Sequence, residues 1–253
     1  MVRTLLLFLM LAVTLICGGC GTMGPVKPLK KALPNAPQQV KLQQKGTAML
    51  LSWTAPTRHQ NGDLIENLGG FYIYRASYDP DSGCPECRPP KNLLSKIDLG
   101  YYRSNHSGKR ISFWDNDVAA GNGYRYKIVP YTDSNGIGTA TTIHRACITP
   151  PLPPQDIIAA GLDRQVRLRW KIAANVKPET MRGYNIYRRQ GDNYFSPQPL
   201  NKKPLTQLRY DDFAVKNGQE YHYALRSVIA VDGHIVESTL STEVTATPAR
   251  PVQ

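Results

Sequence analysis

The sequence predicts an all-β protein in which two tandem β-sandwiches follow a cleaved N-terminal export signal. Three observations lead to this prediction. Short segments rich in β-branched and aromatic residues alternate apolar with polar positions, which is the period of a strand with one buried face. A proline cluster divides the chain near its middle, and the same residue pattern occurs on both sides of it. No stretch of sequence has the apolar stripe of an amphipathic helix.

Residues 1–19 have the layout of a secretory signal peptide. Arg3 provides a basic start, an apolar run extends from Leu5 to Ile16, and small residues follow. A transmembrane helix needs about 20 apolar residues, so this run is too short to span a bilayer. We therefore expect the segment to be removed on export.

The residues from Leu15 to Cys20 resemble the lipobox of bacterial lipoproteins, although Cys17 stands where that family usually has leucine. The resemblance implies that Cys20 becomes the first residue of the mature chain and is lipidated. Gly21 follows the cysteine, as in lipoproteins sorted to the outer membrane. We therefore expect an outer-membrane lipoprotein that faces the periplasm or the cell exterior. The alternative is an ordinary secretory signal with an incidental cysteine.

Proline content and charge define the rest of the domain plan. Residues 20–35 are rich in proline and lysine and predict an extended, lipid-linked tether. Prolines in 150–154 predict a semi-rigid linker between domain 1 (36–149) and domain 2 (155–248), with 249–253 as a tail.

The net charge of +12 favours anionic neighbours. Its basic residues are scattered, so we expect solubility beside an anionic membrane and no specific nucleic acid partner.

The internal repeat is the most informative pattern in the chain. The matched positions, first half then second, are Leu51-Ser52-Trp53 with Leu168-Arg169-Trp170, Gly70–Arg75 with Gly183–Arg188, and Val118, Gly121, Tyr124, Tyr126 and Ile128 with Val215, Gly218, Tyr221, Tyr223 and Leu225. Each half resembles a fibronectin type III domain, an immunoglobulin-like sandwich of seven strands. The resemblance implies that Trp53 and Trp170 fill the two cores. It also implies that Tyr124 and Tyr221 form tyrosine corners, in which the hydroxyl bonds to nearby backbone.

The segment from Tyr74 to Tyr124 in domain 1 is longer than the matching segment from Tyr187 to Tyr221 in domain 2. The extra residues form an insertion that contains Cys84 and Cys87. Oxidised cysteine pairs are the usual state in exported proteins, so we predict a local Cys84–Cys87 disulfide. A bridge from either cysteine to Cys147 is the alternative. Binding residues are commonly placed in such loops, so we expect any dedicated site of domain 1 to lie here.

Other side chains that could support chemistry favour structural roles. A zinc site formed by Cys84 and Cys87 together with His144 and Cys147 is disfavoured. His144 and Cys147 are three positions apart, and residues an odd number apart on a strand face opposite sides of the sheet. The clusters Asp115-Asn116-Asp117 and Asp211-Asp212 could be calcium ligands or an acid–base pair. Their recurrence at equivalent repeat positions favours turn residues that bond local amides. The histidines are dispersed and no nucleophile motif is present, so we expect no catalytic residues, metal or cofactor.

These features predict a non-catalytic, membrane-anchored envelope lipoprotein that binds or scaffolds an envelope protein or glycan. One alternative is a redox- or zinc-linked protein that uses the Cys84 and Cys87 insertion. Another is an accessory subunit of an envelope assembly complex, because Cys20–Val26 resembles the start of lipopeptides of the lipopolysaccharide assembly machinery. A third is an accessory to an envelope enzyme, since such sandwiches often accompany glycosidases.

Overall fold

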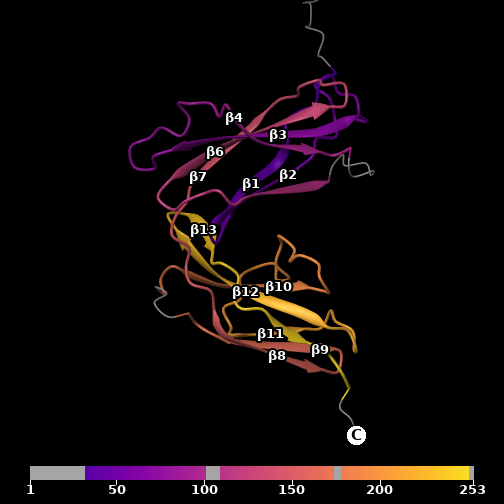
Figure 1. Cartoon of the computed structure of the whole chain (residues 1–253), viewed down its shortest axis with the longest axis vertical. Helices are drawn as coiled ribbons and strands as arrows, with labels where there is room; N and C mark the ends of the chain where they lie inside the picture. The colour runs from indigo at the N-terminus through magenta and orange to yellow at the C-terminus, as the bar shows by residue number, and fades with distance from the viewer. Residues whose placement is uncertain (1–31, 101–108, 174–177, 251–253) are drawn as a thin grey trace, which may run out of the picture. The chain divides into compact units, whose positions relative to one another are not determined.

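A computed structural model describes residues 32–100, 109–173 and 178–250, and these residues form β-strands joined by turns and loops (Figure 1). The predicted fold class is confirmed: the chain is all-β and folds into immunoglobulin-like sandwiches. The expected signal peptide, the lipidation site Cys20 and the tether up to residue 31 lie outside the described residues. Within those residues, no helix has the length and apolarity needed to cross a membrane.

The first sandwich pairs two antiparallel sheets. Their strands are β1 (Gln38–Lys45), β2 (Ala48–Thr54) and β5 (Arg110–Asp115) in one sheet, and β4 (Asn92–Asp98), β3 (Leu68–Tyr78), β6 (Gly123–Thr132) and β7 (Thr141–Ala146) in the other. Trp53 of β2 is fully buried between the sheets and meets the Phe71 ring of β3 edge-on, with centroids 5.3 Å apart. The core of domain 1 is therefore built around this tryptophan.

The second sandwich repeats the plan with a divided last strand. Its strands are β8 (Gln155–Leu162), β9 (Gln165–Lys171) and β11 (Arg209–Asp212) in one sheet, and β10 (Met181–Arg189), β12 (Tyr221–Val231), β13 (His234–Glu237) and β14 (Val244–Ala246) in the other. Trp170 packs edge-on against Tyr184 at 5.3 Å. In β9, Val166, Leu168 and Trp170 are buried while Arg169 is exposed, so the period-two pattern is realised directly.

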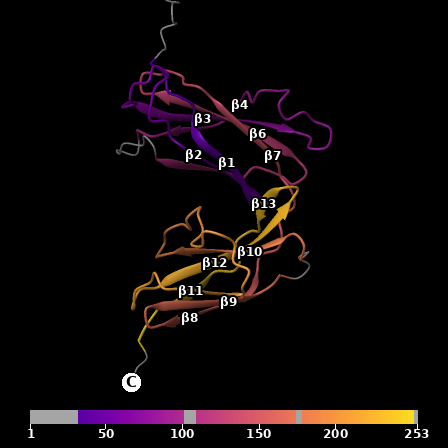
Figure 2. The same cartoon turned by 180° about the vertical axis from the view of Figure 1, so that it is seen from behind.

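One sheet continues from the first sandwich into the second, which the sequence did not predict. The end of β1 pairs in parallel with β13, with Gln44 opposite Val236 and Lys45 opposite Glu237 (Figure 2). The Gly46 amide donates to the Glu237 carbonyl at 2.8 Å. The two domains are therefore joined by a strand pairing in addition to the chain segment between β7 and β8.

Candidate functional site

The insertion of domain 1 is the loop of residues 79–91, which joins β3 to β4 and projects beyond these strands (Figures 1 and 2). A disulfide links Cys84 to Cys87, as predicted, with the Cα atoms 5.3 Å apart. Asp79 starts the loop as a turn residue: its carboxylate accepts hydrogen bonds from the Asp81 amide and the Ser82 hydroxyl. The loop is thus closed by both covalent and local polar contacts.

Arg125 fastens this loop to the sheet. It lies on β6, and its Nη1 donates to the backbone carbonyls of Pro85, Glu86 and Arg88 at 3.1, 2.9 and 3.3 Å. One guanidinium therefore binds three acceptors around the disulfide. These contacts strengthen the attachment of the loop, because a hydrogen bond from a charged donor is stronger than one from a neutral donor.

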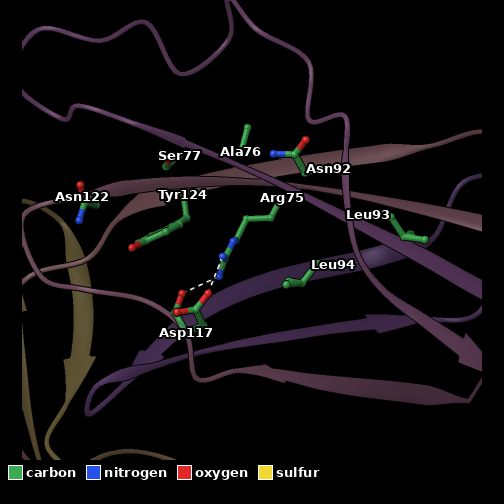
Figure 3. Close-up of a pocket in the computed structure, with 9 residues that line it drawn as sticks. All are labelled: Arg75, Ala76, Ser77, Asn92, Leu93, Leu94, Asp117, Asn122 and Tyr124. Atoms are coloured by element: carbon green, nitrogen blue, oxygen red, sulfur yellow. Dashed lines mark hydrogen bonds and ion pairs between the residues drawn. The ribbon is translucent and has the colours of Figure 1, made fainter.

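A polar hollow lies beside the loop, and we call it the insertion groove (Figure 3). Its volume is about 390 Å³. The polar side chains that line it are Arg75, Ser77, Asn92, Asp117, Asn122 and Tyr124. A neighbouring hollow of about 470 Å³ shares Arg75, Ser77 and Asn92 and extends to Arg88 and Lys91 of the insertion. The groove therefore runs from the sheet onto the insertion itself.

Arg75 and Asp117, the charged side chains of the 390 Å³ hollow, are already paired. Arg75 Nη1 donates to both oxygens of Asp115 at 3.0 and 2.9 Å, and Nη2 donates to Asp117 Oδ2 at 2.8 Å. Burial opposes the charge of this guanidinium, but its bonds to Asp117 and Asp115 raise the pKa of Arg75 above its ordinary value. Arg75 is consequently a permanent cation that positions two carboxylates and is unsuited to proton transfer.

The same arrangement occurs in domain 2, where Arg188 Nη1 donates to Asp212 Oδ2 at 2.7 Å. In both domains a tyrosine hydroxyl also donates to the carboxylate: Tyr126 to Asp115 at 2.7 Å and Tyr223 to Asp212 at 3.0 Å. Burial, and then the bonded carboxylate, raise the pKa of both tyrosines. An arrangement present in both sandwiches is part of the fold and does not mark a reactive centre.

Asp115 and Asp212 act as turn residues, as expected, and also do more. Asp115 accepts the Asp117 amide at 3.1 Å and Asp212 accepts the Ala214 amide at 2.9 Å. Both are almost fully buried, which the turn interpretation did not anticipate. The sequence contained a signal for buried acidic partners, because Arg75 and Arg188 are matched residues at the end of the longest repeated segment.

The remaining candidate residues occupy structural positions. The Tyr124 hydroxyl accepts the Ala119 amide at 2.9 Å, and the Tyr221 hydroxyl accepts the Lys216 amide at 3.0 Å. These bonds have the geometry expected of tyrosine corners. Asp211 is paired with Arg167 and Arg209 at the surface.

The third cysteine of the described chain takes no part in a disulfide. Cys147 is free and buried, and burial raises the pKa of its thiol. His144 is exposed on β7. In the part of the chain that the structure describes, no three His, Cys, Asp or Glu side chains group together to hold a metal ion. The insertion and Cys147 are therefore separate features.

The insertion groove is equipped for hydrogen bonding. Ser77, Asn92 and Asn122 present hydroxyl and amide groups, while the Asp117 side chain is 89% exposed although it is paired with Arg75. Amide and hydroxyl groups can both donate and accept, so they suit a ligand with many polar groups. The arrangement supports recognition of such a ligand.

Comparison with known proteins does not assign this chain to a family. No protein-family model matches the chain. A 105-residue stretch is 35% identical to part of an amylopullulanase from Thermoanaerobacter thermohydrosulfuricus; it covers 42% of this chain and 6% of that enzyme, so the chain spans a small fraction of this curated relative. The solved FN1-FN3 domains of chicken CNTN1 align with 86% of this chain and 68% of theirs, at 15% identity and a TM-score of 0.35. The structure itself thus assigns the fold: two immunoglobulin-like β-sandwiches in tandem.

Proposed function

We propose that this chain is a non-catalytic, lipid-anchored protein of the bacterial cell envelope, in which domain 1 binds an envelope protein or glycan. The observation that supports this most is the disulfide-closed insertion, held by Arg125 next to a polar groove in which Arg75 and Asp117 are paired. A loop fixed before binding loses little conformational entropy when it binds. The groove therefore has the properties of a preorganised recognition surface.

Anchoring through Cys20 gives this recognition surface a location. The tether and the lipid would keep domain 1 close to the outer membrane, where its partner would be concentrated. The similarity between one segment and part of an amylopullulanase supports a glycan as one of the two partner classes. A zinc-linked role has less support, because Cys84 and Cys87 are joined to each other and offer no thiolates as ligands.

Site-specific photocrosslinking in living cells tests this proposal. A photoreactive amino acid at Ser77 or Asn92 should give discrete adducts, because both positions line the groove. The same probe at Leu64, which is 63% exposed on domain 1 and outside the groove, is the matched control. In a Cys20→Ala background the chain should leave the membrane fraction and the adducts should disappear. Adducts of equal yield from Leu64, or adducts and membrane retention that survive Cys20→Ala, would contradict the proposal.

A further inference from the structure

A second hollow, the junction pocket, lies where the two sandwiches share a sheet. Its volume is about 600 Å³. Domain 1 contributes Lys45 and Trp114, and domain 2 contributes Tyr187, Arg226 and the segment 194–197. Sites for small ligands typically measure about 300–1,000 Å³, whereas a peptide usually needs an extended groove. The size of the pocket therefore suits a compact ligand of a few rings.

Aromatic rings that no core needs form the walls of the junction pocket. Trp114 is 37% exposed and Tyr194 is 98% exposed, whereas the other tryptophans, Trp53 and Trp170, are buried in the two cores. Trp114 lies directly opposite Leu50 in the β2–β5 register, on the same side of the sheet. Phe195 adds a third ring. Rings in these positions offer flat apolar faces to a ligand.

The base of the pocket carries an excess of one positive charge. Lys45 Nζ donates to Glu237 Oε1 at 3.0 Å and to the Tyr187 hydroxyl at 2.7 Å. Arg226 Nε lies 3.7 Å from Glu237 Oε2, which is too far for a hydrogen bond. One carboxylate thus faces two cations.

Arg226 is the less compensated of the two cations. Its Nη1 donates to the Ser238 carbonyl at 2.6 Å, but its buried Nε has no hydrogen-bond acceptor in the described part of the chain. Burial lowers the pKa of both Arg226 and Lys45, so their surroundings disfavour the charged forms. An anion in the pocket would relieve this cost.

We propose that the junction pocket binds an acidic saccharide, a sugar ring that bears a carboxylate. One acidic ring at the base brings a single negative charge there and matches the excess, whereas a phosphate monoester brings about −1.5 to −2 to the same position. The C–H face of the sugar would pack on Trp114 and Tyr194, because an aromatic face carries partial negative charge. The inference rests on the binding role proposed above and names a ligand class and a second site for it.

Fluorescence of the full-length chain in detergent tests this inference. Of the three tryptophans in the sequence only Trp114 is substantially exposed, so acrylamide should quench mainly its emission. Trigalacturonic acid should protect Trp114, and neutral maltotriose should bind at least roughly tenfold more weakly, because a buried cation would lose its partner. Added salt should weaken the binding of trigalacturonic acid and leave the binding of maltotriose unchanged, because only the former depends on charge. Equal binding of the two sugars would overturn the inference, as would a hexaglutamate peptide that binds as tightly as trigalacturonic acid.

Variants of the pocket locate the binding. Tyr194→Ala should raise the Kd for trigalacturonic acid by roughly fivefold through the loss of one stacking ring. Arg226→Met should raise it by more than tenfold. Phe213→Ala, which removes a 70% exposed ring outside the pocket, should change nothing. If Arg226→Met does not fold, the affinity of Tyr194→Ala for trigalacturonic acid still tests the inference, because Tyr194 is exposed. Wild-type affinity of this variant would overturn the inference. Crosslinks from Ser77 and Asn92 do not involve Tyr194, so the two proposals fail separately.

Discussion

At the scale of single residues, Asp115 and Asp212 occupy equivalent positions in the two sandwiches and bind matching sets of partners. Each accepts bonds from an arginine, a tyrosine hydroxyl and a backbone amide, and each is at most 3% exposed. A buried carboxylate with several donors cannot be replaced by a neutral group without leaving a buried cation uncompensated. These two residues should therefore be more sensitive to substitution than the surface acids.

We expect Asp212→Asn to lower the free energy of unfolding by about 2–4 kcal/mol, because Arg188 would keep its charge without a counterion. Chemical denaturation followed by tryptophan fluorescence measures this change. Asp117→Asn is the control: its carboxylate is 89% exposed although paired, so the expected change is below about 0.5 kcal/mol. Similar losses in the two variants would show that burial of Asp212 does not matter.

At the scale of elements, the insertion depends on contacts from outside itself. The Cys84–Cys87 bridge closes a loop of only a few residues, so it stabilises the whole domain by at most about 2 kcal/mol on the chain-entropy model. Arg125 supplies the connection to the sheet. The conformation of the loop should therefore be more sensitive to Arg125 than the stability of the domain is.

Arg125→Gln should increase the rate at which a glutamate-specific protease cuts after Glu86 by at least roughly tenfold, because a loop freed from three hydrogen bonds fits a protease more easily. Limited proteolysis at equal protease concentration measures this rate. Lys127→Gln, two residues further along the same strand, is the matched control, and the protease should cut it at the wild-type rate. An unchanged rate in Arg125→Gln would mean that the disulfide and the local contacts of Asp79 order the loop without Arg125.

The elements were predictable where the pattern was local. Strands such as β9 follow from alternating residues, and the core positions of Trp53 and Trp170 follow from the repeat. The arginine clamp on the insertion and the pairing of β1 with β13 left no such pattern. Lys45 and Glu237 resemble ordinary surface charges in the sequence, and only the fold buries them against each other.

At the scale of the whole molecule, Lys45 and Glu237 form an ion pair between the domains with side chains that are 2% and 5% exposed. Asn185 and Tyr187 also donate to Glu237, at 2.8 and 2.6 Å. Within domain 1, Gln44 fixes the segment that leads into the linker, since its side chain bonds both the amide and the carbonyl of Ile148. The junction is therefore a packed polar interface.

A double-mutant cycle measures the coupling between the domains. Lys45→Met should lower the free energy of unfolding by about 2–4 kcal/mol, because Glu237 would lose a buried counterion. Combining it with Glu237→Gln should cost less than the sum of the two single changes, by at least about 1 kcal/mol. Lys41→Met, on the exposed part of the same strand, should have little effect. Strict additivity would show that the pair does not couple the domains.

The pairing of β1 with β13 also has a consequence for folding kinetics. Lys45 and Glu237 are 192 residues apart, so the first strand of the described chain pairs with one of the last. Contacts between residues so distant in sequence form slowly, because a long loop must close before they contribute any stability. Domain 1 can assemble its own core as soon as β7 is available, and the end of β1 can pair with β2 at that stage. Its other edge stays unpaired until β13 of the second sandwich has folded. Arrival of the C-terminal strands thus completes a site on the N-terminal domain, and the junction pocket exists only in chains that have finished folding.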